Sequence, residues 1–306
     1  MNLSLQEKST IDLFYLHDSY IVCAVKIITT LEELANTRSK VTGLVALVPT
    51  MGALHAGHLQ LIKDAREAVG EKGTVIVSIY VNPTQFDRTE DLEKYPKTLT
   101  HDTVACQKAG VDYLFTPTSL YFKDSSITVT EDSVSKHLCG KSRPGHFNGV
   151  CTVVLKLYNL TRPDIMVFGA KDFQQVAVIQ RMTRDLHLPV TLHISPTVRE
   201  PSGLAMSSRN QRLSPNALAE APTIFKTLKQ IKQNLQSRNL TLSEIESAFT
   251  EGVVECQTPS SIDYISLVNA YTLEKVNEDF KGQAILAIAV FFDGIRLIDH
   301  ISVDLN

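Results

Sequence analysis

The chain has 306 residues, 43% of them hydrophobic and 21% charged, and its formal net charge is −3. This balance is typical of a globular protein with a sizeable core, and the length favours two domains over one. The slight acidity argues against a broad nucleic-acid-binding face. The longest apolar run, residues 284–292, is far too short to span a membrane.

Cysteine usage and the N-terminus indicate the cellular compartment. The cysteines are odd in number and widely spaced, without a Cys-x-x-Cys pair: Cys23, Cys106, Cys139, Cys151 and Cys256. Reduced thiols are therefore expected rather than disulfides or a structural zinc site. The apolar run at residues 20–25 is too short for a signal-peptide core and follows acidic residues. We expect a cytoplasmic protein in which residues 1–25 form an extension ahead of the folded core.

Apolar runs then alternate with helical patterns. Strands are predicted at residues 44–48, 74–81, 112–115, 164–168 and 190–194, and helices at residues 58–69, 101–110, 149–161 and 172–187. Strands separated by helices of this length predict parallel β-α-β units with right-handed crossovers. The expected fold class is α/β: a doubly wound, Rossmann-like parallel sheet, which binds ligands beyond the C-terminal ends of its strands.

After about residue 195 the pattern changes. Two helices are predicted, roughly at residues 215–236 and 242–255, followed by strands near residues 262–268, 284–292 and 295–298. We expect residues 1–195 to form the substrate-binding domain. Residues 196–306 are expected to form a smaller α+β C-terminal domain that closes over it as a lid.

The motif His55-Ala56-Gly57-His58 lies where a predicted strand meets a predicted helix. Its i, i+3 spacing brings both imidazoles to one side of the first helical turn, where free backbone N–H groups and the helix dipole favour an anion. Gly57 has no side chain, so a ligand can approach the backbone closely. Imidazoles at such a site can stabilise the charge that develops on phosphate oxygens during phosphoryl or nucleotidyl transfer.

The same two histidines could instead merely cap the helix. Zinc binding is disfavoured because zinc-binding histidine pairs on helices usually lie at i, i+4 and no third ligand is evident. Two other nucleotide motifs do not occur: the sequence has no Gly-x-Gly-x-x-Gly, and Gly140-Lys141-Ser142 is not a Walker A loop because Ser135 occupies the position of its first glycine. A nucleotide is therefore expected to bind, if at all, at His-x-Gly-His.

Two further loops at strand ends carry polar side chains. Gln85 could offer both a donor and an acceptor to a small polar substrate, or it could be an ordinary loop glutamine. Lys171 could contact a polyphosphate or be a solvated surface charge, whereas helix capping alone could explain Asp172. Gln175 is expected on the same side as Asp172, one helical turn later.

Two more segments are candidates for the same site. Met206-Ser207-Ser208-Arg209 offers two hydroxyls and a guanidinium, which can clamp a phosphate when a loop folds over it, although such loops also occur without function. Arg143 and His146 precede a predicted helix. They either line the site or only shape the turn.

Seven segments, in the same order, resemble the pantothenate synthetase (pantoate–β-alanine ligase) family, a branch of the nucleotidyltransferase superfamily that carries His-x-Gly-His. They are PTMGALHAGH (49–58), YVNPTQF (80–86), YPKTL (95–99), RPGHFNGVCTVVLKL (143–157), FGAKDFQQ (168–175), PTVRE (196–200) and GLAMSSRN (203–210). The resemblance extends from about Lys26 to Ile301.

The resemblance implies a two-step ligation that uses ATP and Mg²⁺. The carboxylate of (R)-pantoate attacks the α-phosphate of ATP, giving pantoyl adenylate and pyrophosphate. The amine of β-alanine then displaces AMP to give pantothenate. The resemblance also implies a homodimer whose other partners are small molecules rather than nucleic acid or membrane.

The resemblance further implies roles for individual residues. His58, with His55 and Lys171, would carry the catalysis, while Gln85 would contact pantoate and β-alanine and Gln175 would contact pantoate. The matching ATP-binding positions are Met51, Gly52, Ala53, Leu54, His55, Ala56, Gly57, His58, Gly169, Ala170, Lys171, Asp172, Val198, Met206, Ser207, Ser208 and Arg209. The sequence departs from the family pattern at Ala56 and Ala170, where glutamate is common, and at Ser202, where aspartate is common.

Three other functions are compatible with parts of this pattern. A different His-x-Gly-His nucleotidyltransferase would act on a phosphorylated partner and should have more basic residues in place of the two glutamines. A tRNA synthetase is disfavoured because the chain is short and acidic, with no evident anticodon-binding module. A catalytically silent nucleotide-binding protein could share the fold, but the complete set of His55, His58, Lys171 and Arg209 argues against it.

Overall fold

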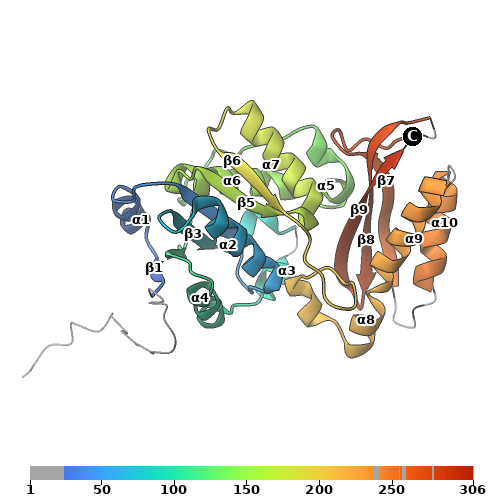
Figure 1. Ribbon diagram of the computed structural model, residues 1–306, viewed down its shortest axis with the longest axis horizontal. Coiled ribbons are helices and arrows are strands. Elements are labelled where there is room, and N and C mark those ends of the chain that lie inside the picture. Colours follow the sequence, from blue (N-terminus) through green and yellow to red (C-terminus); the bar gives the residue numbers. More distant parts are fainter. Residues whose placement is uncertain are drawn as a thin grey trace, which may run out of the picture.

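A computed structural model describes residues 24–87, 89–237, 241–254, 256, 260–277 and 279–305 (Figure 1). Cys23 and nearly all of the expected N-terminal extension lie outside these residues. The strands of the first domain are β1 (Lys26–Ile28), β2 (Val45–Thr50), β3 (Thr74–Ile79), β4 (Tyr113–Phe115), β5 (Ile165–Gly169) and β6 (Thr191–Ser195). They form one sheet in the order β1-β4-β3-β2-β5-β6, and every neighbouring pair is parallel.

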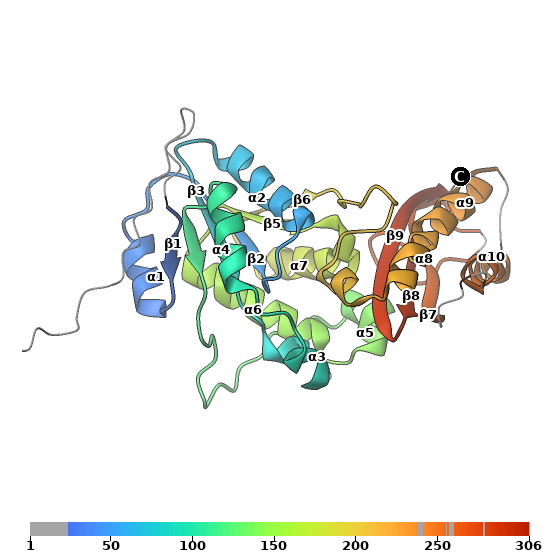
Figure 2. The same cartoon turned by 90° about the horizontal axis from the view of Figure 1, so that it is seen from below.

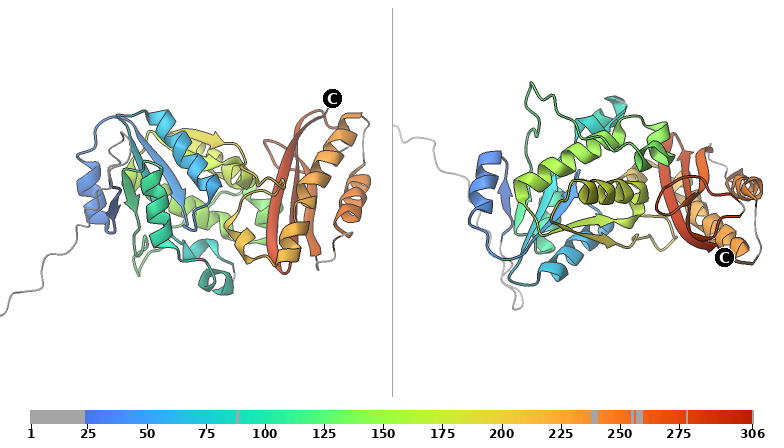
Figure 3. Two further views of the ribbon diagram at one scale, coloured as in Figure 1. Left: turned by 60° about the horizontal axis from the view of Figure 1, so that its bottom comes forward. Right: turned by 90° about the horizontal axis from the view of Figure 1, so that it is seen from above.

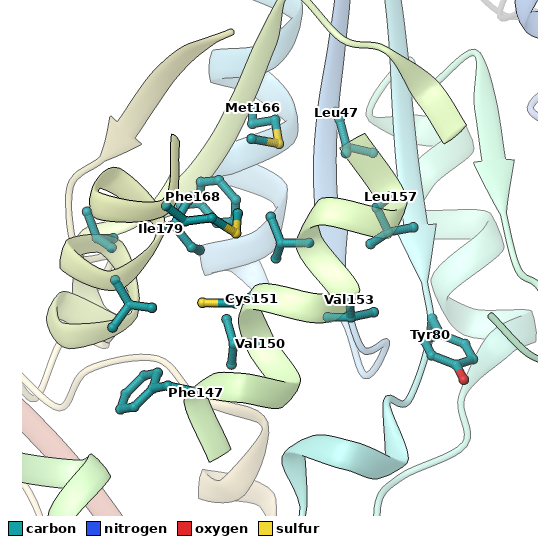
Figure 4. Packing of buried hydrophobic residues seen from close by; sticks show 14 of the residues in the cluster. Leu47, Tyr80, Phe147, Val150, Cys151, Val153, Leu157, Met166, Phe168 and Ile179 are labelled. Atoms are coloured by element: carbon teal, nitrogen blue, oxygen red, sulfur yellow. The ribbon is translucent and has the colours of Figure 1, made fainter. Parts of the chain in front are cut away.

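Helices cover both faces of this sheet. They are α1 (Leu31–Arg38), α2 (Ala56–Val69), α4 (Leu99–Lys108), α6 (His146–Thr161) and α7 (Phe173–Asp185). Because side chains alternate along a strand, Leu47 of β2 packs with α6 and α7, whereas its neighbours Ala46 and Val48 pack with α2. Figure 4 shows the first of these cores, and Figure 2 shows the helices around the sheet.

The order of the strands reverses at β2. From β2 the chain adds β3 and β4 on one side, then crosses over and adds β5 and β6 on the other side. Open α/β sheets bind ligands in the crevice at such a switch point, beyond the carboxyl ends of the two flanking strands. Here those ends lead into the turns that carry His55 and Lys171.

The second domain is an antiparallel sheet with helices on its outer face. Its elements are α8 (Pro215–Glu220), α9 (Thr223–Ser237), α10 (Leu242–Val254), β7 (Ser260–Asn269), β8 (Gly282–Phe292) and β9 (Ile295–Leu305). The sheet stands between the first domain and the helices α9 and α10 (Figure 3). Val268, Ile285 and Ala287 on its inner face belong to the same apolar cluster as residues of the first domain, so this sheet packs directly against the first domain.

The structure confirms the doubly wound sheet and most of the predicted elements. The single helix expected at 215–236 was wrong: Pro222 lacks a backbone N–H and interrupts it, so α8 ends at Glu220 and α9 begins at Thr223. The last strand is longer than predicted because β9 pairs with β8 along its whole length. The two strands are joined by a two-residue turn with positive φ at Asp293 and Gly294.

Several short elements were not predicted. They are β1, α1, α3 (Thr89–Glu93) and α5 (Leu138–Ser142). Each is too short to show a clear period in the sequence. Across the part of the chain that is described, no helix is long and apolar enough to span a membrane.

Candidate functional site

His55 and His58 cap the first turn of α2 reciprocally. His55 is the N-cap residue, and its Nδ1 accepts a hydrogen bond from the backbone N–H of Gly57 at 3.1 Å. The Nδ1 of His58 accepts from the backbone N–H of His55 at 3.4 Å, and the ring centroids lie 4.1 Å apart. Since each Nδ1 is an acceptor, the proton of each neutral ring lies on Nε2. Capping therefore orients two N–H donors rather than competing with a role in binding.

Glycine at position 57 is required by the histidine ring itself. A Cβ on Gly57 would lie 2.9 Å from Cε1 of His55, which is closer than real Cβ contacts allow. The glycine in His-x-Gly-His thus makes room for the first imidazole to fold back over the helix N-terminus.

Both imidazoles are neutral at neutral pH. Burial, with a further contribution from His55, lowers the pKa of His58 to about 3. Burial and then the charge of Lys171 lower the pKa of His55. The two rings can therefore offer hydrogen-bond donors but no charge, and the positive charge of the site comes from other residues.

Those charges are Lys171 and Arg209. Asp172 occupies the N-cap position of α7 but makes no capping hydrogen bond; its carboxylate accepts from Nζ of Lys171 at 3.3 Å. Burial alone would raise the pKa of Asp172, but Lys171 and Arg209 together lower it, so this carboxylate is ionised. Two cations and one carboxylate leave a net positive charge, which favours an anionic ligand.

The turn from Met51 to Leu54 is held by a residue that the sequence analysis missed. Asp102 of α4 is 1% exposed, and its carboxylate accepts hydrogen bonds from the backbone N–H groups of Ala53 and Leu54, each at 2.9 Å. The Oγ1 of Thr98 donates to the same carboxylate at 3.0 Å. Thr98 lies in the segment YPKTL, which was noted for its resemblance but not for this role.

A cavity of about 200 Å³ lies beyond the ends of β2 and β5. The predicted site residues that line it are Met51, His55, Gly57, His58, Gln85, Gly169, Lys171, Asp172, Gln175, Val198, Met206, Ser207, Ser208 and Arg209. The other predicted positions do not line it: Gly52, Ala53 and Leu54 are buried in the turn, Ala56 is exposed, and Ala170 directly precedes Lys171. The loops that follow β2, β3, β5 and β6 therefore meet at one edge of the sheet.

Hydrogen bonds hold both the side chain and the backbone carbonyl of Gln85. Its side-chain Oε1 accepts a hydrogen bond from Nδ2 of the buried Asn82 at 2.9 Å, which leaves Nε2 as the donor toward a ligand. Its backbone carbonyl accepts from Arg143 Nη2 at 3.0 Å and from His146 Nδ1 at 2.7 Å. Burial and the charge of Arg143 lower the pKa of His146 to about 4. Arg143 and His146 therefore shape the turn that presents Gln85.

A second cavity, of about 300 Å³, lies between the two domains. Arg143 and His146 line it as well. It shares seven lining residues with the first cavity: Met51, Gln85, Lys171, Asp172, Gln175, Ser207 and Arg209. Gln85 and Gln175 thus lie at the boundary between the positively charged cavity and the cavity lined by the second domain.

This fold and site define a nucleotide-binding α/β protein whose His-x-Gly-His turn lies at the switch point of its sheet. Comparison with known proteins narrows the class. The sequence model of the pantoate-beta-alanine ligase family matches residues 25–302. The chain belongs to this family.

Individual relatives agree with this assignment. A pantothenate synthetase of Akkermansia muciniphila is 47% identical over 261 residues, which are 84% of this chain and 91% of the relative. One of Thermobifida fusca is 44% identical over 284 residues, 90% of this chain and 95% of the relative.

Solved structures are similar as well. The pantothenate synthetase of Thermus thermophilus has a TM-score of 0.82 and 37% identity, and the match covers 90% of this chain and 99% of that one. The pantoate-beta-alanine ligase of Francisella tularensis, determined with beta-gamma ATP and beta-alanine, has a TM-score of 0.75 and 32% identity, covering 91% and 97%.

Proposed function

We propose that this enzyme uses ATP to ligate (R)-pantoate and β-alanine to pantothenate, through a pantoyl-adenylate intermediate. The family assignment supports the reaction. The observation that carries the proposal at the level of residues is the shared boundary of the two cavities. His55 and His58, the proposed donors to phosphate oxygens, line only the first cavity, and the two carboxamides, Gln85 and Gln175, line both.

In the first step a carboxylate oxygen of pantoate attacks the α-phosphorus of ATP. The bond from that phosphorus to the oxygen bridging to the β-phosphate breaks, and pyrophosphate leaves. Negative charge on the phosphate oxygens is stabilised by the Nε2–H groups of His55 and His58 and by the cations Lys171 and Arg209. These groups are held in place before the substrate binds, and no protein nucleophile is needed.

In the second step the amine of β-alanine attacks the acyl carbon of the mixed anhydride and AMP leaves. The intermediate must be protected from water, which would cleave the same bond. The C-terminal domain, residues 196–306, serves as the cover, because its inner sheet face forms the far wall of the second cavity.

Mg²⁺ is proposed to enter with the triphosphate. Protein sites for Mg²⁺ commonly use one or two carboxylates together with substrate phosphates, and the ionised Asp172 fits that pattern. Within the described residues, no group of three or more His, Cys, Asp or Glu side chains could hold a metal by itself. When bound, Mg²⁺ neutralises phosphate charge.

We propose a homodimer that works in the cytoplasm. Two large apolar side chains on the segment after β4 support dimerisation: Phe122 is 73% exposed and Ile127 is 82% exposed. Sedimentation velocity should show a single species of twice the chain mass. A monomer at micromolar concentration would contradict the dimer.

The reaction is tested by incubating the protein with ATP, Mg²⁺ and pantoate, with and without β-alanine, and following pyrophosphate and AMP. Pyrophosphate release is expected to depend on pantoate, while AMP and pantothenate should appear only after β-alanine is added. ATP turnover that is indifferent to pantoate would instead favour another nucleotidyltransferase of this class.

Replacing Gln85 by alanine is expected to impair the use of pantoate specifically. The change removes the Nε2 donor at the boundary of the cavities, so the KM for pantoate should rise about tenfold while the KM for ATP stays nearly unchanged. Steady-state kinetics of pyrophosphate release measure both constants. Gln180→Ala, at an exposed position of α7, is the matched control. An unchanged pantoate KM and rate would remove Gln85 from the site.

A further inference from the structure

Residues 198–206 form a tight hairpin in front of the nucleotide cavity. Arg199 and Ala205 are paired as an antiparallel bridge, and the backbone N–H of Met206 donates to the carbonyl of Val198 at 3.0 Å. Val198 and Met206 line the cavity, as do the residues that follow the hairpin, among them Arg209. The position of the hairpin therefore sets the position of residues Ser207–Arg209, which we call the clamp.

One side chain fastens this hairpin to β9 and α9. The guanidinium of Arg199 binds the buried carboxylate of Asp299 in β9 with two hydrogen bonds, at 2.6 and 2.9 Å. The same guanidinium lies 3.4 Å from the centroid of the Phe225 ring in α9 and donates to the carbonyl of Gly203 at 3.2 Å. A planar guanidinium that forms two hydrogen bonds to a carboxylate and also stacks on a ring has one favoured orientation. The contact therefore fixes the position and the orientation of the hairpin.

The next residue of β9 contacts the start of α7. The carboxylate of Asp299 also accepts a hydrogen bond from the backbone N–H of His300 at 2.8 Å. The ring of His300 packs against Phe173, with centroids 5.2 Å apart, and Phe173 directly follows Asp172. Two consecutive residues of β9 thus contact the hairpin and the start of α7, next to Asp172.

We propose that Arg199 and Asp299 are positioning residues that hold the Ser207–Arg209 clamp against the triphosphate. Neither residue is proposed to contact a substrate. Their pairing makes the placement of the clamp depend on the position of the sheet formed by β7, β8 and β9. This inference rests on the proposed function, because it identifies the ligand of the clamp as the phosphates of ATP.

The test is Asp299→Asn, which keeps the shape of the side chain and removes its charge. The affinity for a non-hydrolysable ATP analogue, measured by calorimetry, should fall about 10- to 100-fold, and the KM for ATP should rise with it. The KM for pantoate should change less than about twofold, because Gln85 and Gln175 lie on other elements. A purely structural ion pair would not produce this split between the two substrates.

Asp112→Asn is the matched control. Asp112 likewise pairs with an arginine, Arg66, and accepts a backbone N–H, from Val75, but it lies away from the cavities. It should lower the melting temperature without changing nucleotide affinity. If Asp299→Asn proves too unstable, Arg199→Met and Arg199→Lys provide the second comparison, in which lysine should retain more analogue affinity than methionine because it keeps the charge.

Two results would overturn the inference. One is unchanged analogue affinity in a folded Asp299→Asn protein, and the other is an equal rise in the KM values for ATP and pantoate. A failure of the proposed function would look different: the unmodified enzyme would release no pantoate-dependent pyrophosphate. In that case the binding measurement would still decide whether the pair positions the clamp.

Discussion

Replacing His58 by alanine is expected to lower the rate of pantoate-dependent pyrophosphate release by about 10²-fold or more, with a much smaller effect on ATP affinity. The reason is geometric. The backbone N–H of His55 holds Nδ1 of His58, so Nε2 carries a proton that can be donated to the phosphate oxygens as charge develops. Single-turnover kinetics and analogue binding separate the two effects.

His58→Gln is the informative comparison. Its amide can place an N–H donor near the position of Nε2, so it should recover part of the lost rate. Equal losses in ground-state binding and in rate for His58→Ala would make His58 a binding residue and contradict the catalytic role.

The neutrality of the imidazoles adds a pH dependence to the same experiment. An ordinary histidine would gain a proton as the pH falls through about 6.5. Because the pKa of His58 is lowered to about 3, the ring should stay neutral, with Nδ1 as acceptor and Nε2 as donor, far below that value. Pyrophosphate release at saturating MgATP should therefore stay level from about pH 7.5 to about pH 5.5 as far as this histidine is concerned.

The second large effect is expected for Lys171→Met. The change removes one of the two cations and leaves the carboxylate of Asp172 without its partner at 3.3 Å, so the net positive charge of the site falls to zero and its attraction for the triphosphate is lost. The value of kcat/KM for ATP should fall about 10²- to 10³-fold. Lys63→Met, at an exposed lysine of α2, should leave the kinetics unchanged. A loss of less than about threefold at Lys171 would show that Arg209 alone suffices.

The first domain could be predicted largely from the sequence because its signals are local. Buried strands such as β2 and β5 are continuous apolar runs, and the helices between them are long enough to show a period. The short elements β1 and α5 carry no such signal, since three to five residues do not make a pattern. The break before α9 does have a local signal, Pro222, which the single helix predicted at residues 215–236 did not include.

The site was predictable where it follows strand ends and not where it depends on long-range contacts. His55, Gln85 and Lys171 could be placed together because parallel strands end at one edge of a sheet. Asp102 reaches the Ala53–Leu54 turn from a helix far along the chain, and nothing near it in the sequence marks that contact. Arg199 and Asp299 are a hundred residues apart, so their pairing required the fold.

The sequence also presented capping and ligand binding at His55 as alternatives, whereas the capping geometry in the structure is compatible with both. The backbone bonds to Nδ1 that cap α2 are the same bonds that leave Nε2 protonated. A local pattern cannot show this, because it depends on the rotamers of both rings.

The central claim is that two neutral imidazoles, each protonated on Nε2, face the phosphates of the nucleotide. Long-range ¹H–¹⁵N correlation spectra of ¹⁵N-histidine-labelled enzyme, assigned with His55→Gln and His58→Gln, measure the protonation state of each ring nitrogen. At neutral pH both rings should be neutral with the proton on Nε2, and the Nε2 signals should shift when an ATP analogue is added. Cationic rings, protons on Nδ1, or signals that ignore the nucleotide would contradict the account.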